Sequence, residues 1–261
     1  MESGIDIRVV ARPLLFVGLA ALAFLPLERI AAARAQRRGR FAADLAFATL
    51  GQVVVRLGIV VVVGAALARL DRVALDRPLL AAIGDLRARA LAEVAVGLLL
   101  FELGGYAYHR LSHSVPALWR LHEVHHSSET MDWLASFRQH PLEILLLALA
   151  QNAPLVLLGV PLGAHATVLV VLKLATVYVH SNLRVPLGPL RFLVATPQFH
   201  HRHHQRDGAS ANFAALFPFL DVVFGSYDGA DAAGRFGVAR PLPDSFVGLL
   251  LAPLRRGDRT P

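Results

Sequence analysis

Five apolar runs constrain what this chain can fold into more than any other feature. They cover residues 13–27, 41–68, 90–108, 142–160 and 164–179. A helix needs about 20 mostly apolar residues to cross a bilayer, and these runs reach or approach that length without the alternation expected of barrel strands. Backbone groups in hydrocarbon must be hydrogen-bonded within their own segment, which favours helices. The sequence therefore predicts an all-α, polytopic membrane bundle of about four to five crossings.

Composition agrees with this class and excludes several others. The 261 residues are 55% hydrophobic and 17% charged, which is too apolar for an ordinary soluble domain of this length. The net charge of +7 comes mainly from arginine, and no basic run is interleaved with stacking aromatics, so nucleic acid is not an expected partner. The chain has no cysteine, which excludes disulfides, thiolate ligands and iron–sulfur clusters. Any metal must bind to nitrogen and oxygen.

Charge also predicts the orientation in the membrane. The segment after the first run carries Arg29, Arg34, Arg37, Arg38 and Arg40. The positive-inside rule places this segment in the cytoplasm, and five crossings then put both histidine-bearing segments on the same side. A signal peptide is an alternative for the first run, because residues 33–35 have the form of a cleavage site, but most of the charges follow the run. We expect an integral, multi-pass protein with a histidine-rich helical cap on the cytoplasmic face.

The twelve histidines all lie between His109 and His204. Three motifs, HRLSH, HEVHH and HHRHH, contain histidines at ligand spacing: His109 and His113; His122, His125 and His126; and His200, His203 and His204. Residues three and four apart share a helix face, so each motif should aim its imidazoles at one point. Eight nitrogens are too many for one zinc ion, which takes four ligands. The motifs therefore indicate a dinuclear centre, in preference to a polar interfacial surface without metal.

The other four histidines carry separate expectations. His180 lies where the fifth crossing returns to the cytoplasmic side and is a candidate ligand. For His140, which precedes Pro141, a ligand, a partner of a ligand and a helix-start residue all remain open. His201 would point about 100° away from its neighbour His200 on a helix, and His165 lies near the outer end of the hairpin, so neither is expected to bind metal.

These motifs resemble the fatty acid hydroxylase superfamily, often called the sterol desaturase family, over residues 91–227. The likeness also includes VPALWRLHEVHHSSETMDW, RQHPLE, the HSN at residues 180–182 and NFAALFPFLDVVFGS. It implies an integral-membrane, nonhaem diiron oxygenase that uses two iron ions, O₂ and external electrons to hydroxylate or desaturate a lipid, or to cleave an ether. The implied metal ligands are His109, His113, His122, His125, His126, His180, His200, His203 and His204, and all but His180 are also predicted to be catalytic.

One position departs from that pattern. Members with fatty-acid substrates resemble HxxxHH before the last hairpin return, whereas Thr176 stands four residues before His180 here. That ligand is absent, and His140 or water could substitute for it. Six carboxylates are candidates to orient the imidazoles, and the sequence does not rank them: Glu123, Glu129, Asp132, Glu143, Asp207 and Asp221.

The resemblance divides the chain into membrane helices and a loop at 1–89, a catalytic domain at 90–227 and a C-terminal tail at 228–261. The substrate should be a sterol, a fatty acyl group or a related lipid. With no flavin fingerprint, no thiolate and no room for a haem domain, the chain should take electrons from a separate ferredoxin, cytochrome or reductase. A zinc-dependent membrane hydrolase is one alternative. A histidine-rich metal transporter is another, although transport favours ligands at mid-membrane rather than at helix ends.

Overall fold

A computed structural model describes residues 7–36, 39–73, 80, 82–160, 162–207 and 210–255, and within these ranges it contains helices and two isolated β-bridges but no strand. The all-α prediction is confirmed. The long helical segments are α1 (Ile7–Ile30); the continuous stretch of α2 (Phe41–Ala46), α3 (Gln52–Gly58) and α4 (Gly64–Leu70), joined by two π-helical turns; α5 (Leu86–Ser112); α7 (Pro141–Leu157); and α8 (Leu162–His180).

Three of these segments are long and apolar enough to cross a membrane: Ala11–Ile30, Phe41–Leu70 and Leu86–Ser112. The helix α7 and the portion of α8 from Thr167 to His180 are apolar but shorter. A helical membrane bundle is therefore supported, and the total of four to five crossings stays a prediction. Apolar side chains on the first two segments face outward, as expected for contact with lipid; Leu22 is 75% exposed and Val61 is 67% exposed.

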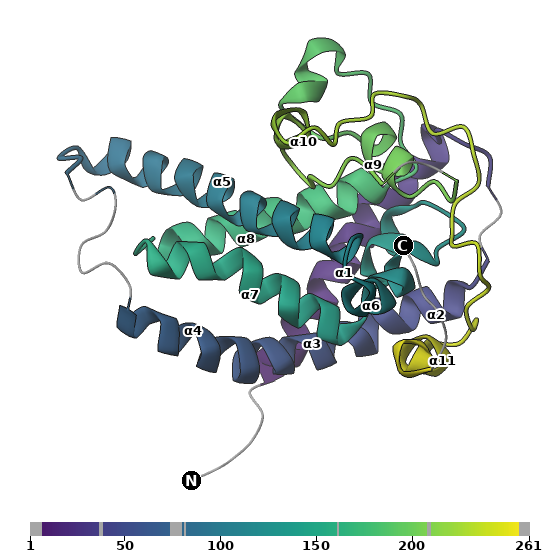
Figure 1. The fold of residues 1–261 in the computed structure, drawn as a ribbon, viewed down its shortest axis with the longest axis horizontal. Helices are drawn as coiled ribbons and strands as arrows, with labels where there is room; N and C mark the ends of the chain where they lie inside the picture. The colour runs from purple at the N-terminus through teal and green to yellow at the C-terminus, as the bar shows by residue number, and fades with distance from the viewer. Residues whose placement is uncertain are drawn as a thin grey trace, which may run out of the picture.

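The helices α4, α5, α7 and α8 run along the length of the bundle and α1 crosses them obliquely; successive long segments alternate in direction, so that chain segments distant in sequence meet at one end of the bundle (Figure 1). Close packing within the bundle depends on small residues. A Cβ added to Gly104 of α5 would lie 2.3 Å from the carbonyl oxygen of Ala150 in α7, so α5 and α7 can approach this closely only with glycine at that position.

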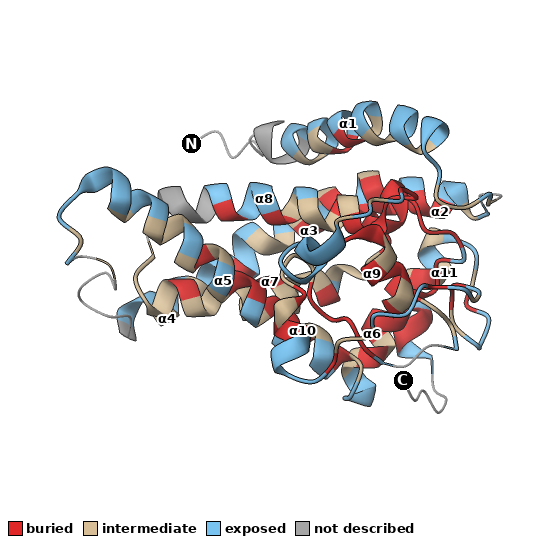
Figure 2. Ribbon diagram, turned by 90° about the horizontal axis from the view of Figure 1, so that it is seen from above, coloured by how far each residue is buried: buried red, intermediate tan, exposed pale blue. Residues whose placement is uncertain are grey.

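The predicted cap lies at this shared end. It contains α6 (Pro116–His126), the 3₁₀ turn η4 (Trp133–Phe137), α9 (Pro197–His203), α10 (Phe219–Val223) and α11 (Phe246–Leu251). Three helices, α6, α7 and α9, begin with proline at their first position, where its fixed φ is favourable and its missing N–H costs nothing. Figure 2 shows that buried residues gather at this end, around α6 and α9, whereas α1 is largely exposed.

The described part of the arginine-rich segment after α1 joins the same end, whereas Arg37 and Arg38 lie outside the described residues. Ala33 donates its backbone N–H to the Asn182 carbonyl at 2.8 Å, and the Asn182 side chain donates to the Arg34 carbonyl at 2.9 Å. Asn182 follows α8 by two residues, so the ends of α1 and α8 lie at one level. This agrees with the predicted placement of this segment and both histidine-bearing segments on one side of the membrane. After Ser245 the described chain forms α11 and then a short 3₁₀ turn, Ala252–Leu254.

Candidate metal centre

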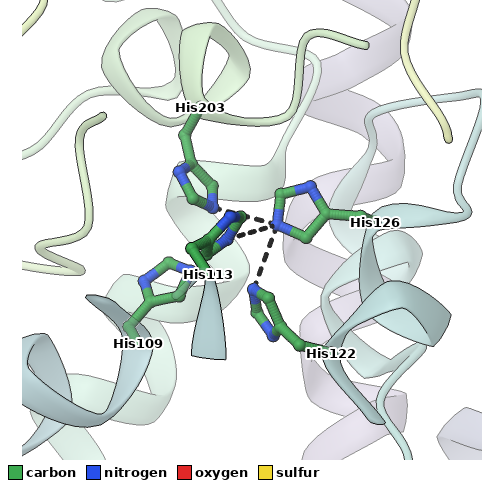
Figure 3. A group of neighbouring side chains, drawn as sticks. All are labelled: His109, His113, His122, His126 and His203. Carbon is green, nitrogen blue, oxygen red and sulfur yellow. Dashed lines mark hydrogen bonds between the residues drawn. The ribbon is translucent and has the colours of Figure 1, made fainter. Parts of the chain in front are cut away.

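Nine histidines from four helical segments converge at the cap end. They come from α5 and its C-cap, α6, the last residue of α8, and α9 with its C-cap. The start of α9 is fixed by Thr196, whose hydroxyl accepts the backbone N–H of Phe199. The structure divides the nine imidazoles into two groups, with ligand nitrogens within 4.8 Å of one another in each: His109, His113, His122, His126 and His203; and His125, His180, His200 and His204. Figure 3 shows the five-membered group.

The division differs from the expectation that each motif would aim at one point. In α6, His122 and His126 enter the first group, but His125 enters the second. In α9, His200 and His204 stay together while His203 crosses to the other group. The reason is helix geometry: residues four apart lie roughly 40° apart around the axis, but the intervening i+3 residue lies about 100° from the i+4 residue. Each HxxHH motif therefore serves two groups.

The Nε2 atoms of each group face one another. In the first group, His126 Nε2 lies 3.0 Å from His122 Nε2, 3.0 Å from His203 Nε2 and 3.1 Å from His113 Nε2. In the second, His180 Nε2 lies 3.1 Å from the Nε2 atoms of both His125 and His200. Ligand nitrogens about 2.1 Å from one ion would lie roughly 3.0 to 3.4 Å apart at neighbouring positions. The observed spacing is close to this range.

Backbone carbonyls fix the tautomer of four of these rings. The Nδ1 atoms of His109 and His203 lie 2.7 Å from the carbonyl oxygens of Phe213 and Ala211. Those of His125 and His180 lie 3.0 and 2.7 Å from the carbonyl oxygens of Arg138 and Thr176. A carbonyl only accepts, so Nδ1 carries the proton of each neutral ring. Their Nε2 atoms are left with lone pairs directed into the groups.

Lone pairs that face each other require a cation between them. His125 and His180 both hold their proton on Nδ1, so no proton is available for the 3.1 Å contact between their Nε2 atoms. His109 Nε2 is buried and has no hydrogen-bond partner in the part of the chain that the structure describes. Such an arrangement is unfavourable without an ion and is what a metal site needs. The residues therefore fit a nitrogen-ligated metal.

Burial keeps the imidazoles neutral and ready to bind a cation. Desolvation, reinforced by His122, lowers the pKa of His126 well below the usual histidine range. Desolvation also lowers the pKa of His125 to about 4, and desolvation together with His180 lowers that of His200. A protonated imidazole cannot bind a metal, so these lowered pKa values preserve the ligands at neutral pH.

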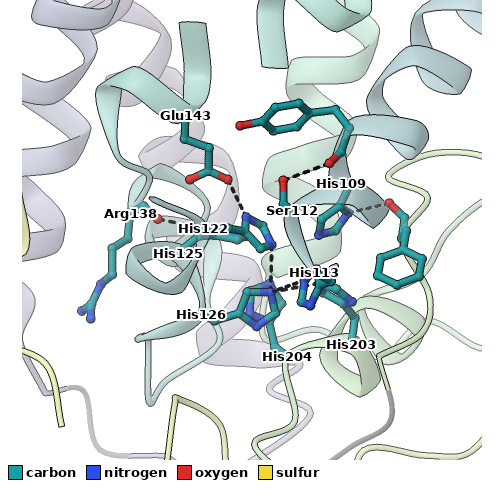
Figure 4. Close-up of polar contacts among 12 residues, drawn as sticks. His109, Ser112, His113, His122, His125, His126, Arg138, Glu143, His203 and His204 are labelled. Carbon is teal, nitrogen blue, oxygen red and sulfur yellow. Dashed lines mark hydrogen bonds and ion pairs between the residues drawn. The ribbon is translucent and has the colours of Figure 1, made fainter. Parts of the chain in front are cut away.

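Of the six carboxylates that the sequence left unranked, Glu143 alone contacts an imidazole of the two groups among the described residues. Its Oε1 atom lies 2.5 Å from His122 Nδ1, and both side chains are buried (Figure 4). The described contacts of the other five carboxylates lie elsewhere: Asp221 accepts backbone N–H groups, Asp132 caps η4, Glu129 pairs with Arg40, Glu123 pairs with Arg240, and Asp207 is exposed. Glu143 is therefore the carboxylate that orients a ligand ring directly.

Sequence reasoning missed Glu102 of α5, which is 1% exposed. Its Oε1 atom accepts the backbone N–H groups of Ala215, Leu216 and Phe217 at 2.7, 2.6 and 3.2 Å. Asp221 accepts the two preceding N–H groups, so two carboxylates hold five consecutive amides of the loop that supplies the Phe213 carbonyl to His109. The available signal was an acidic residue inside an apolar run, which is costly in a membrane unless it has partners.

We expect Glu102→Gln to lower the free energy of unfolding by about 1 to 2 kcal/mol, because a neutral amide oxygen replaces a charged acceptor for three buried N–H groups. Denaturant unfolding in detergent, followed by circular dichroism, measures the change. Glu93→Gln on the same helix is the matched control, since among the described residues Glu93 pairs only with Arg89 one turn away, and its loss should be less than about 0.5 kcal/mol. Equal losses in the two variants would contradict the role given to Glu102.

The three remaining histidines lie outside both groups or outside the described side chains. His140 is the N-cap of α7: its Nδ1 accepts the Leu142 N–H, and its Nε2 donates to the Leu250 carbonyl. Of the roles left open for it, the helix-start position is the one observed. His201 Nε2 lies 3.4 Å from the His180 carbonyl oxygen, and its ring packs against Phe236. The side chain of His165 lies outside the described residues.

The fold and the site together define a helical membrane protein with two buried imidazole groups suited to metal ions. The fatty acid hydroxylase family model matches residues 94–226, and the chain belongs to this family. It is 28% identical to an ornithine lipid hydroxylase of Rhizobium tropici over 64% of this chain and 52% of that protein. It is 29% identical to the alkylglycerol monooxygenase of Homo sapiens over 54% of this chain and 32% of that protein.

A very-long-chain aldehyde decarbonylase of Oryza sativa subsp. indica is 34% identical over 46% of each chain. The matches thus span about half or less of the length of these curated relatives. No solved structure matches this chain.

Proposed function

We propose that this protein is a membrane-bound, nonhaem diiron oxygenase that hydroxylates or desaturates a lipid. The observation that carries the proposal is the pair of buried imidazole groups in a member of the fatty acid hydroxylase family. Relatives named as an ornithine lipid hydroxylase and an alkylglycerol monooxygenase support both the oxidative reaction and the lipid substrate. The substrate is a sterol, a fatty acyl group or a related lipid that reaches the site from the bilayer.

Each imidazole group would hold one iron ion. The first group offers five nitrogens, one more than the four ligands of a zinc site, which favours iron over the zinc of a hydrolase. Imidazole suits iron, and two redox-active ions together can supply the electrons needed to split O₂. The meeting of these nine histidines in two groups supports their assignment as the iron ligands.

The protein's own residues orient the ligands and keep water out. Carbonyls of Thr176, Ala211 and Phe213 hold ring protons on Nδ1, and Glu143 holds His122. Thr176, the position that departs from the family pattern, supports His180 through its backbone carbonyl, so its side chain need not be a ligand. Burial of these rings excludes bulk solvent, which strengthens electrostatic interactions within the site and limits side reactions.

We further propose a domain division, an electron donor and an orientation in the membrane. Catalysis is assigned to residues 90–227, with membrane helices at 1–89 and a tail at 228–261. Electrons come from a separate ferredoxin, cytochrome or reductase. The arginine-rich segment that joins the metal end supports a cytoplasmic site, because Arg34 lies at the level of Asn182 just beyond α8.

The proposal is tested by metal analysis and lipid profiling of cells with and without the protein. We expect iron in the purified chain, reductant-dependent O₂ uptake, and a lipid that gains the mass of one oxygen or loses the mass of two hydrogens. Zinc without O₂ uptake would indicate the hydrolase instead. Uptake of labelled metal into proteoliposomes, with no change in lipid mass, would indicate a transporter.

We expect Glu143→Gln to weaken metal retention by about 10- to 100-fold, because the substitution replaces the charged partner of His122 while preserving side-chain shape. Iron content after graded exposure to a chelator measures this effect. Asp207→Asn is the control, since Asp207 is an exposed carboxylate of the same cap. Identical chelator curves for the two variants would show that Glu143 does not support the metal.

A further inference from the structure

A cleft of about 480 Å³ lies beside the cap, apart from the two imidazole groups. Its lining brings together four segments of the chain: the stretch after α1, the loop between α6 and η4, the residues that follow α9 and the loop before α11. The residues that define it chemically are Arg34, Gln36, Glu129, Arg206, Arg235 and Phe236. Three guanidinium groups therefore face one carboxylate, which leaves an excess of two positive charges.

The arginines of the cleft are positioned without being neutralised. Arg34 Nη1 donates to the Gly234 carbonyl and Arg206 Nη2 donates to the Phe236 carbonyl, both at 3.3 Å. These partners are neutral carbonyls, so the charges stay available. Arg235 is exposed, with no ion pair among the residues that the structure describes. The side chain of Glu129 is 59% exposed, and its Oε1 atom forms an ion pair with Arg40 Nη2 at 3.7 Å.

Several contacts join the segments that line the cleft. Arg206 donates its backbone N–H to the Arg235 carbonyl at 2.8 Å, and Gln205 forms an isolated antiparallel bridge with Phe236. Arg34 stacks on the Phe236 ring at 4.9 Å, which fixes its guanidinium. At Gly237, where φ is +93°, an added Cβ would lie 3.2 Å from Arg206 Nη2. Glycine at this position therefore leaves room for the Arg206 side chain. Preorganised cationic groups bind an anion with little loss of entropy.

The position of Arg34 places the cleft relative to the membrane surface. Arg34 donates its backbone N–H to Asn182 Oδ1 and accepts from the same side chain, so it lies just beyond the ends of α1 and α8. α1 is one of the three helices long and apolar enough to span a bilayer. The first residues beyond a membrane helix lie among lipid headgroups. The cleft therefore lies at headgroup level on the metal side of the bundle.

We propose that this cleft is a phosphate-binding site, lined by Arg34, Arg206 and Arg235, whose occupant is the phosphate of an anionic membrane lipid or free phosphate. Arginine provides the planar, multiple N–H donors that suit phosphate oxygens. A concave volume of about 480 Å³ suits a headgroup rather than the broad contact surface of an acidic protein. The site is separate from the metal centre and does not depend on the proposed oxygenase activity.

The test uses the full chain in nanodiscs of phosphatidylcholine with a minor share of phosphatidylglycerol, released into neutral detergent for native mass spectrometry. Wild type should retain phosphatidylglycerol in preference to phosphatidylcholine, and the double variant Arg206→Gln/Arg235→Gln should lose roughly tenfold or more of that preference. Arg184→Gln is the matched control, because Arg184 is an exposed arginine that follows α8 outside the cleft. The single variant Arg235→Gln changes an exposed position that should not affect folding. It should show an intermediate loss of the preference for phosphatidylglycerol.

Inorganic phosphate distinguishes the two sources. If it displaces phosphatidylglycerol, or stabilises the wild type in pure phosphatidylcholine but not the double variant, free phosphate also occupies the cleft. If phosphatidylglycerol is retained and phosphate does not compete, the lipid is the ligand. Either result supports the proposal. Equal retention by wild type, the cleft variants and Arg184→Gln would overturn it, and so would binding of an acidic protein without any phosphate ligand.

Discussion

Replacing His125 by alanine is expected to lower turnover by more than about 100-fold and to reduce the iron content per chain to roughly half. His125 belongs to the four-membered group, where its Nε2 faces His180, and its loss leaves three imidazoles there. The five-membered group keeps all its ligands, so one ion should remain. Elemental analysis and O₂ uptake with a reductant measure the two effects.

The fold should survive this substitution, because His125 lies outside the apolar segments long enough to span a membrane. His140→Asn is the control: asparagine is a good N-cap residue and can replace the helix-capping role of His140 at the start of α7. It should retain full iron content and near wild-type turnover. Unchanged activity in His125→Ala, or complete loss of both ions, would contradict the assignment of His125 to the second group.

Much of the architecture could be predicted from the sequence because the bilayer permits few solutions. Runs of apolar residues in hydrocarbon must become helices, and the confinement of twelve histidines to one stretch indicated a site. The number of crossings was harder to predict, because α7 and the described part of α8 are shorter than a full span and their depth depends on packing against α5. The length of an apolar run alone does not decide whether such a helix crosses the membrane.

The division of the metal centre could not be predicted, because it depends on rotation about the axes of α6 and α9. Spacing showed that His122, His125 and His126 lie on one side of a helix, but not that a 100° difference would send His125 to a separate group. The contacts that support the ligands could not be predicted from the sequence either. Glu102 binds amides more than one hundred positions later in the chain, and no local pattern marks such a partnership.

Another long-range contact that the sequence conceals joins the metal centre to the second membrane segment. Arg138 is 1% exposed, and its Nε lies 2.5 Å from Asp44 Oδ1, which is also fully buried. Arg138 also donates to the carbonyl and hydroxyl oxygens of Ser127, the residue that caps α6. Because the Arg138 carbonyl accepts from His125 Nδ1, this ion pair fixes a ligand of the second group as well as the junction between α2 and η4.

Asp44→Ala should therefore lower the free energy of unfolding by about 3 to 5 kcal/mol, since it leaves a guanidinium buried without its carboxylate partner. The double variant Asp44→Leu/Arg138→Met removes both charges and keeps apolar volume, so it should recover most of that loss. Unfolding in detergent and iron retention, measured on the wild type, Asp44→Leu, Arg138→Met and the double variant, complete a double-mutant cycle. If the double variant is no more stable than Asp44→Ala, the cost does not arise from an uncompensated buried charge. If stability returns but iron retention does not, Arg138 positions His125 in a way that a neutral side chain cannot replace.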